Sequence, residues 1–163
     1  MNILPIQNDI VSKLNVAFTA ASLPFRSFDL PDVPNDVQKA VANPIVFVAY
    51  TGSTAEPSMD ARVIYQNRKL NFNIEINARR LNGENGMFAA RDVVEQVLTG
   101  CTPINCGKLY LVKDDINQTD DNVWVHIYQM ETQTMLVQKD EQDIVVVPNF
   151  TTLNDKTLSN EEV

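Results

Sequence analysis

Two stretches of the chain carry the spacing of an amphipathic helix. Near the N-terminus, apolar residues recur at steps of three and four, which predicts a helix over residues 5–21. Pro5 suits the first turn of this helix, and Pro24 prevents its extension. The same spacing predicts a second helix, with Gly100 just beyond its C-terminal end. Its apolar residues are Met87, Ala90, Val94, Val97 and Leu98.

A weaker pattern predicts a short helix over residues 35–42, and three other stretches predict strands. Residues 25–28 form a short extended piece, and residues 45–50 are apolar on both faces, as in a central strand. Residues 70–79 alternate, with Leu70, Phe72, Ile74, Ile76 and Ala78 on one face and Asn71, Asn73, Glu75 and Asn77 on the other. Tyr65 is out of phase with Leu70, so we expect a bulge or turn within residues 66–69. Residues 51–60 are expected to form a loop.

The last two predicted strands cover residues 108–113 and 122–137, and a polar turn over residues 114–121 joins them. Along the final strand, Val123, Val125 and Ile127 alternate with Trp124, His126, Tyr128 and Met130. We expect one of these faces to meet the helices and the other to bind a partner.

These elements predict an α+β fold in which a mixed, mostly antiparallel sheet has two helices packed on one face. We assign residues 1–138 to this domain and residues 139–163 to a C-terminal extended arm around the apolar run Ile144, Val145, Val146 and Val147. The expected core contains Ile10, Leu14, Phe18, Phe47, Phe72, Ile74, Val94 and Leu98.

The composition of the chain argues against several classes of function. The formal net charge of -8 and a pI near 4.5 argue against specific binding to a phosphate backbone. The N-terminus lacks the pattern of a secretion signal, and no apolar run approaches the length that spans a membrane. We therefore expect a protein that is made and assembled in the cytoplasm and does not bind a membrane.

No motif predicts catalysis, a cofactor or a metal site. His126 is the single histidine and has no nucleophile in a matching motif, which favours a packed or interface histidine over a catalytic one. The aspartates of residues 114–121 fit a solvated turn better than a calcium loop, because the glycine and glutamate of an EF-hand loop are missing. Cys101 and Cys106 are too few for a zinc site; two free thiols are favoured, and a disulfide or redox pair is the alternative.

The order of segments resembles that of a known family. It comprises the strand NPIVFVAYTG, the alternating strand RKLNFNIEINARRLNGENG, the helix AARDVVEQVL and the final strand NVWVHIYQMETQT. These segments resemble the small tail proteins of Mu-like phages and prophages, and the architecture is similar to that of tail terminators such as the minor tail protein U of lambdoid phages. The resemblance covers residues 6–137 and includes an N-A-R-x-L junction that begins at Asn77.

This resemblance implies a hexameric ring in the virion that caps the head-proximal end of a tail tube. The implied partners are other copies of the chain, the tail tube and sheath proteins and the head–tail connector or neck proteins, with DNA passing through the lumen. The expected interface combines Asn71, Asn73, Glu75, Asn77, Trp124, His126, Tyr128 and Met130 with Ile144, Val145, Val146 and Val147. Two alternatives are a neck or baseplate adaptor of a contractile tail and a small cytoplasmic enzyme.

Overall fold

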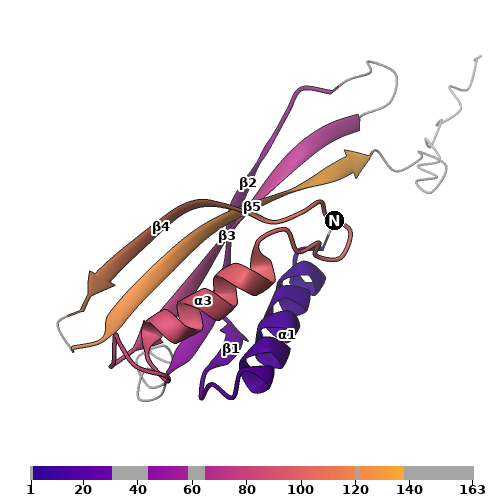
Figure 1. The fold of residues 1–163 in the computed structure, drawn as a ribbon. Coiled ribbons are helices and arrows are strands. Elements are labelled where there is room, and N and C mark those ends of the chain that lie inside the picture. Colours follow the sequence, from indigo (N-terminus) through magenta and orange to yellow (C-terminus); the bar gives the residue numbers. More distant parts are fainter. Residues whose placement is uncertain (1, 31–43, 59–64, 120–121, 138–163) are drawn as a thin grey trace, which may run out of the picture.

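The computed structural model describes residues 2–30, 44–58, 65–119 and 122–137. The helix predicted over residues 35–42, the arm from residue 139 and its apolar run lie outside these ranges. In the described part, two helices cover one face of a five-stranded sheet (Figure 1), which confirms the predicted α+β class. No helix in this part is both long and apolar enough to cross a membrane.

The first helix, α1 (Leu4–Ala20), forms where its apolar spacing predicts. Its buried residues are Ile6, Ile10, Leu14 and Phe18, four residues apart, so they form one stripe toward the sheet. Ser22 has a φ of 55°, and the Leu23 backbone N–H donates to the Phe18 carbonyl at 2.9 Å. This left-handed residue and reverse hydrogen bond are a Schellman cap, which ends the helix.

The second helix, α3 (Met87–Leu98), has Gly86 as its N-cap and Gly100 directly after its C-cap residue. A Cβ on Gly86 would lie 2.6 Å from the Asn82 carbonyl oxygen, so only glycine fits at this entry. At the other end Gly100 has a φ of 78°, the left-handed conformation predicted for it. The buried residues Met87, Ala90, Val94 and Leu98 pack toward the sheet and α1.

The sheet order is β1-β2-β3-β5-β4. Its strands are β1 (Arg26–Asp29), β2 (Ile45–Ala55), β3 (Tyr65–Ala78), β4 (Tyr110–Gln118) and β5 (Trp124–Val137). Only β1 and β2 are parallel, and the other three pairs are antiparallel. Helix α1 is held on the parallel edge by Asn15, whose amide donates to the Ser27 carbonyl and whose Oδ1 accepts from the Ser27 N–H at 2.7 Å.

Two strands are longer than the sequence pattern indicates. β2 continues through Ala55 where a loop was predicted, and its extra residue Thr51 forms a bulge between Tyr50 and Gly52. β3 pairs with β5 without interruption from Tyr65, so the prediction of an irregularity within residues 66–69 is wrong. The irregularity belongs to the neighbouring strand.

The strand β4 is also longer than predicted, since it runs through Asp114 and Asp115 to Gln118. These aspartates were assigned to a turn because they are polar and consecutive. They fit a strand because β4 is an edge strand with little cover on either face, where charged side chains stay in water.

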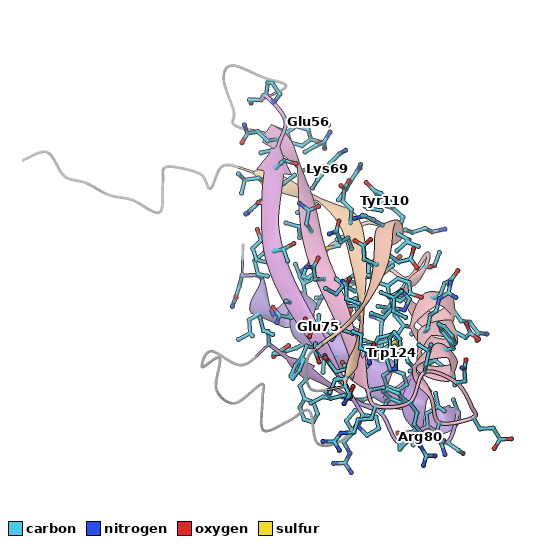
Figure 2. The ribbon with its side chains drawn as sticks, turned by 90° about the vertical axis from the view of Figure 1, so that its left-hand side faces the viewer. Glu56, Lys69, Glu75, Arg80, Tyr110 and Trp124 are labelled. Carbon is cyan, nitrogen blue, oxygen red and sulfur yellow. The ribbon has the colours of Figure 1, made fainter. Side chains whose placement is uncertain are left out.

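Beyond the helices the sheet continues as a projecting end (Figure 1, Figure 2). Glu56 and Lys69 lie on this end in Figure 2, whereas Trp124 and Arg80 lie at the end of the sheet beside the helices. The core therefore lies in the part of β2, β3 and β5 that α1 and α3 cover, toward the end of the sheet with Trp124 and Arg80 (Figure 2).

Candidate protein interaction surface

The strand register shows which side chains share a face of the sheet. Phe72 of β3 pairs with Met130 of β5, and Ile74 pairs with Tyr128. Since directly opposed residues point to the same face, Met130 and Tyr128 lie on the side of the helices with the β3 core residues. On the other face, Asn73 pairs with Gln129 and Glu75 pairs with Ile127.

Four of the eight predicted interface residues that the structure describes therefore lie on the helix side of the sheet. His126, Tyr128 and Met130 are 3%, 1% and 2% exposed, and Trp124 is half-buried against the core cluster. The alternation along β5 was predicted, but its phase was wrong. The large side chains fill the space beneath the helices, and the β-branched Val125 and Ile127 lie half-buried on the opposite face.

The β3 half of the prediction is on the expected face. Asn71, Asn73 and Glu75 are half-buried there, while Asn77 is 4% exposed and donates from Nδ2 to Glu75 Oε1 at 2.8 Å. Their β5 neighbours on this face are Val125, Ile127, Gln129 and Glu131. We call the surface formed by Asn71, Asn73, Glu75, Ile127, Gln129 and Glu131 the open face.

Phe47 requires a related correction. It is 1% exposed, as a core residue should be, but it pairs with Glu75 and so lies on the face opposite the helices. It lies outside the main core cluster, unlike the other seven predicted core residues. Residues on both faces of β2 are thus buried at this level, as the apolar run over residues 45–50 predicts.

Two pairs of opposite charges lie on and beside the open face. Lys69 Nζ lies 3.4 Å from Glu131 Oε1, which also accepts a hydrogen bond from the Tyr110 hydroxyl. On β4, Lys113 Nζ lies 2.5 Å from Asp115 Oδ2. Paired charges cost less to cover with a partner than isolated charges do. The open face is therefore suited to contact with protein.

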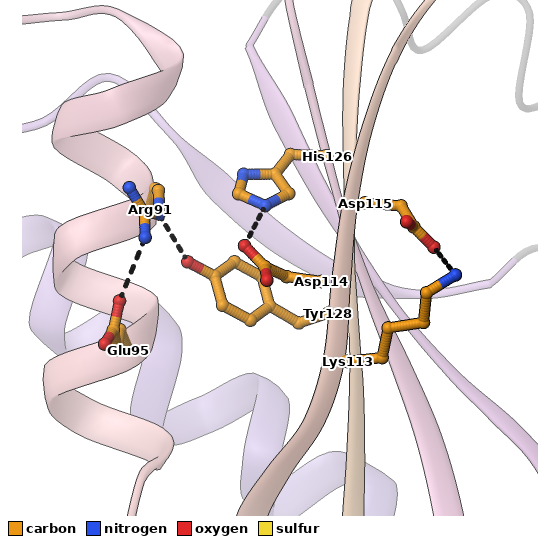
Figure 3. A network of polar contacts seen from close by, with 7 residues as sticks. All are labelled: Arg91, Glu95, Lys113, Asp114, Asp115, His126 and Tyr128. Atoms are coloured by element: carbon orange, nitrogen blue, oxygen red, sulfur yellow. Dashed lines mark hydrogen bonds and ion pairs between the residues drawn. The ribbon is translucent and has the colours of Figure 1, made fainter.

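A polar network joins α3 to β5 and β4 on the helix side (Figure 3). Arg91 donates from Nε to the Tyr128 hydroxyl at 3.0 Å and lies 3.6 Å from Glu95. The ring of Tyr128 stacks on His126, with centroids 4.6 Å apart. His126 Nε2 lies 3.1 Å from Asp114 Oδ2, which links the core to the edge strand.

The electrostatics of this network are those of a structural cluster. Burial raises the pKa of the Tyr128 phenol, and the hydrogen bond from Arg91 opposes that shift. The same hydrogen bond raises the pKa of Arg91, so the phenol remains neutral and the guanidinium charged at neutral pH. His126 Nδ1 is buried without a hydrogen-bond partner within the described residues. The geometry provides a histidine and a carboxylate, and no serine or cysteine of the described ranges is in hydrogen-bond contact with them.

The other candidate residues for chemistry are the possible metal ligands and the two cysteines. Across the described ranges, no group of three or more His, Cys, Asp and Glu side chains could hold a metal ion. Cys101 and Cys106 are free and half-buried in the loop between α3 and β4, and burial raises the pKa of both thiols. This agrees with the favoured prediction of two free thiols.

The edge strand β4 is a surface that sequence reasoning missed. Leu111, Val112 and Ile116 are 37%, 56% and 43% exposed, and among the described strands β4 has a neighbour on one side only. The alternation of apolar and charged residues over residues 110–118 is irregular because Val112 is a bulge between Leu111 and Lys113. The sequence signal was the apolar run before Lys113, but it did not show that neither helix covers the strand.

The fold and this surface define an α+β protein with an open sheet face and an edge strand that exposes apolar side chains. The model of the Gp37 protein family matches residues 16–157, so the chain belongs to that family. The match extends past the end of the described sheet and includes the apolar run that begins at Ile144.

Among solved structures, the fold is similar to that of a chain in the virion of a native gene transfer agent particle. The TM-score is 0.54 at 12% sequence identity, and the match covers 80% of this chain and 94% of that chain. At 12% sequence identity, this match shows a shared fold and nothing more. A comparison with curated proteins found no match.

Proposed function

We propose that this chain is a structural protein of a phage-like virion and acts as the tail terminator. In this role a ring of copies, six in the simplest case, caps the head-proximal end of the tail tube and sheath and joins the tail to the neck. The observation that carries the proposal is the likeness to a virion chain over 94% of its length, because the shared fold is nearly complete.

The surface of the chain supports the same role. A ring of identical copies needs two different patches on each copy, because each interface joins one patch to the other. The open face offers paired charges and amides, and the β4 edge offers exposed apolar side chains. Exposed apolar side chains beside polar groups are typical of surfaces that bind protein.

The charge of the chain is compatible with a channel for DNA. A formal net charge of -8 repels the phosphate backbone, so DNA could pass through a lumen without binding to its wall. The partners in this proposal are other copies of the chain, the tube and sheath proteins and the neck proteins. No membrane or cofactor has a part in it.

Native mass spectrometry of the full chain tests the ring, and assembly of tails with and without the protein tests the position. A terminator predicts a closed oligomer and, in its absence, tubes of uncontrolled length in electron micrographs. Tubes of normal length that fail to join heads would instead identify a neck adaptor. A chain that stays monomeric and leaves tube length unchanged would refute the proposal.

A further inference from the structure

β4 is an edge strand of the described sheet. The strand is nine residues long, and within the described ranges only β5 pairs with it. An edge strand of this length presents a row of backbone N–H and C=O groups that can hydrogen-bond to another strand. The opposite edge, β1, has only four residues and lies against α1 through Asn15.

The features that usually protect such an edge are weakened in β4. Charged side chains along an edge discourage pairing with another strand. Here, however, Lys113 and Asp115 are paired with each other, and Asp114 is turned toward His126 on the neighbouring strand. Apolar side chains are exposed between these charges, with Val112 at 56% and Ile116 at 43%. The edge is therefore suited to accept an apolar strand.

The sequence of this chain contains one segment with the matching chemistry. Residues 144–147 are four consecutive β-branched residues, Ile144, Val145, Val146 and Val147, and Pro148 follows them. β-Branched residues favour strands, and a following proline limits the strand to a short one. The family match includes this segment.

The length of the connecting chain decides whose edge the segment can reach. Leu111 pairs with Met130, which is seven residues before the end of β5 at Val137. At about 3.4 Å per residue, the level of Leu111 lies about 24 Å from Val137 along the strand direction. The added strand would lie on the far side of β4, about 9.5 Å (two strand spacings) from β5 across the sheet. The path is therefore about 26 Å.

Ile144 is seven residues beyond Val137, which allows about 25 Å in a fully extended chain. This leaves no residue for the reversal of direction, and the levels of Lys113 to Ile116 are farther still. Ile144 of one chain therefore does not reach the middle of its own β4 edge, so the four residues 144–147 cannot all pair there. A second copy, whose position is free to vary, has no such limit.

We propose that residues 144–147 of each copy add a strand to the β4 edge of a neighbouring copy. The proposal rests on the proposed ring and specifies its contact, because each copy donates at one place and accepts at another. The recognition is β-strand addition, in which main-chain hydrogen bonds give affinity and alternate side chains fill apolar positions.

Cross-linking of the full chain tests this contact. In a Cys101→Ser and Cys106→Ser background, a tagged chain carries Val112→Cys or Ile116→Cys, and an untagged chain carries Val146→Cys or Val145→Cys. Mild oxidation of the mixture should give a covalent heterodimer, because a disulfide needs Cα atoms within about 7 Å. A tagged chain with Val16→Cys is the control, since Val16 is 68% exposed on α1, away from β4.

A second variant keeps the native cysteines. Val146→Asp should raise the concentration of half-assembly by at least about tenfold, because the carboxylate would be buried at the edge. Val16→Asp is the matched control and should assemble like the native chain. An intact oligomer without heterodimer in any pairing, or normal assembly of Val146→Asp, would overturn the strand addition and leave the ring standing. A chain that stays monomeric at every concentration would overturn both.

Discussion

Tyr128 and Ile127 are neighbours in sequence on opposite faces of β5, so replacing each by alanine tests the assignment of the faces. Tyr128 is 1% exposed beneath α3, and Ile127 is half-buried on the open face. Truncation of a buried aromatic residue to alanine costs about 3–5 kcal/mol through lost burial and the cavity that remains. Loss of the hydrogen bond from Arg91 adds little, because that guanidinium can turn to water.

We therefore expect Tyr128→Ala to lose about 3–5 kcal/mol of the free energy of unfolding, a large part of the 5–15 kcal/mol of an ordinary domain. Ile127→Ala should cost about 1 kcal/mol, because much of its side chain is already in water. Urea denaturation of the monomer at low concentration measures both. In the proposed ring, Ile127→Ala should affect assembly more than it affects the monomer.

The opposite ranking would refute this assignment. If Tyr128→Ala left the monomer within about 0.5 kcal/mol of the native chain and weakened the oligomer, the aromatic side chains of β5 would form the interface. The Trp124 and Tyr128 double variant makes the same distinction. With the faces as the structure has them, it should unfold the monomer rather than dissociate an intact ring.

Leu98→Ala should cost about 2–5 kcal/mol in chemical denaturation, because Leu98 is fully buried at the end of α3; a loss below about 0.5 kcal/mol would contradict this packing. Burial raises the pKa of Tyr128 above its usual 10.0. The contribution of the Tyr128 phenol to stability should therefore be complete below about pH 10 and decline as the pH rises through the folded pKa. Denaturation curves of Tyr128→Phe across this pH range should lack the decline. Burial also raises the pKa of Cys101 and Cys106, so both should be alkylated more slowly at neutral pH than a fully exposed cysteine thiol. Equal rates of alkylation would contradict this prediction. Calcium, zinc and ATP should leave the melting temperature unchanged in a thermal-shift panel, and a reproducible rise would indicate a ligand site.

The elements with a complete apolar stripe could be predicted from the sequence. The stripe of α1, the stripe of α3 with Gly100 and the alternation of β3 are each fixed by local periodicity, and the structure has them within a few residues. The α+β class follows, because two one-sided helices and a one-sided strand need each other's apolar faces.

The phase of β5 could not be predicted, because both of its faces are apolar or amphipathic. Val125 and Ile127 look like core residues and His126 looks like a surface residue, yet the pairing with β3 places His126 inside. Only the partner strand decides this, since a shift of one residue would exchange the two faces. The bulges at Thr51 and Val112 also depend on pairing with a neighbouring strand.

The two bulges lie at the same level of the sheet. Thr51 lies beside Phe72, Val112 lies beside Met130, and Phe72 and Met130 are paired. Bulges increase local twist, so a pair of them at one level turns the projecting end relative to the half beneath the helices. The core stabilises the half of the sheet beneath the helices. The projecting end depends on hydrogen bonds such as that from Arg68 Nε to Ser53 Oγ at 2.7 Å.

The stability of β4 is a consequence of this arrangement. Neither α1 nor α3 covers it, and among the described residues its side-chain links to β5 are the contacts of Asp114 with His126 and of Tyr110 with Glu131. A strand with one neighbour and exposed side chains opens more readily than a central strand such as β3. A strand added by a second copy would give β4 its missing neighbour and cover Val112 and Ile116. Assembly would then order the least protected strand of the sheet, which makes slower hydrogen exchange in β4 a signature of the ring.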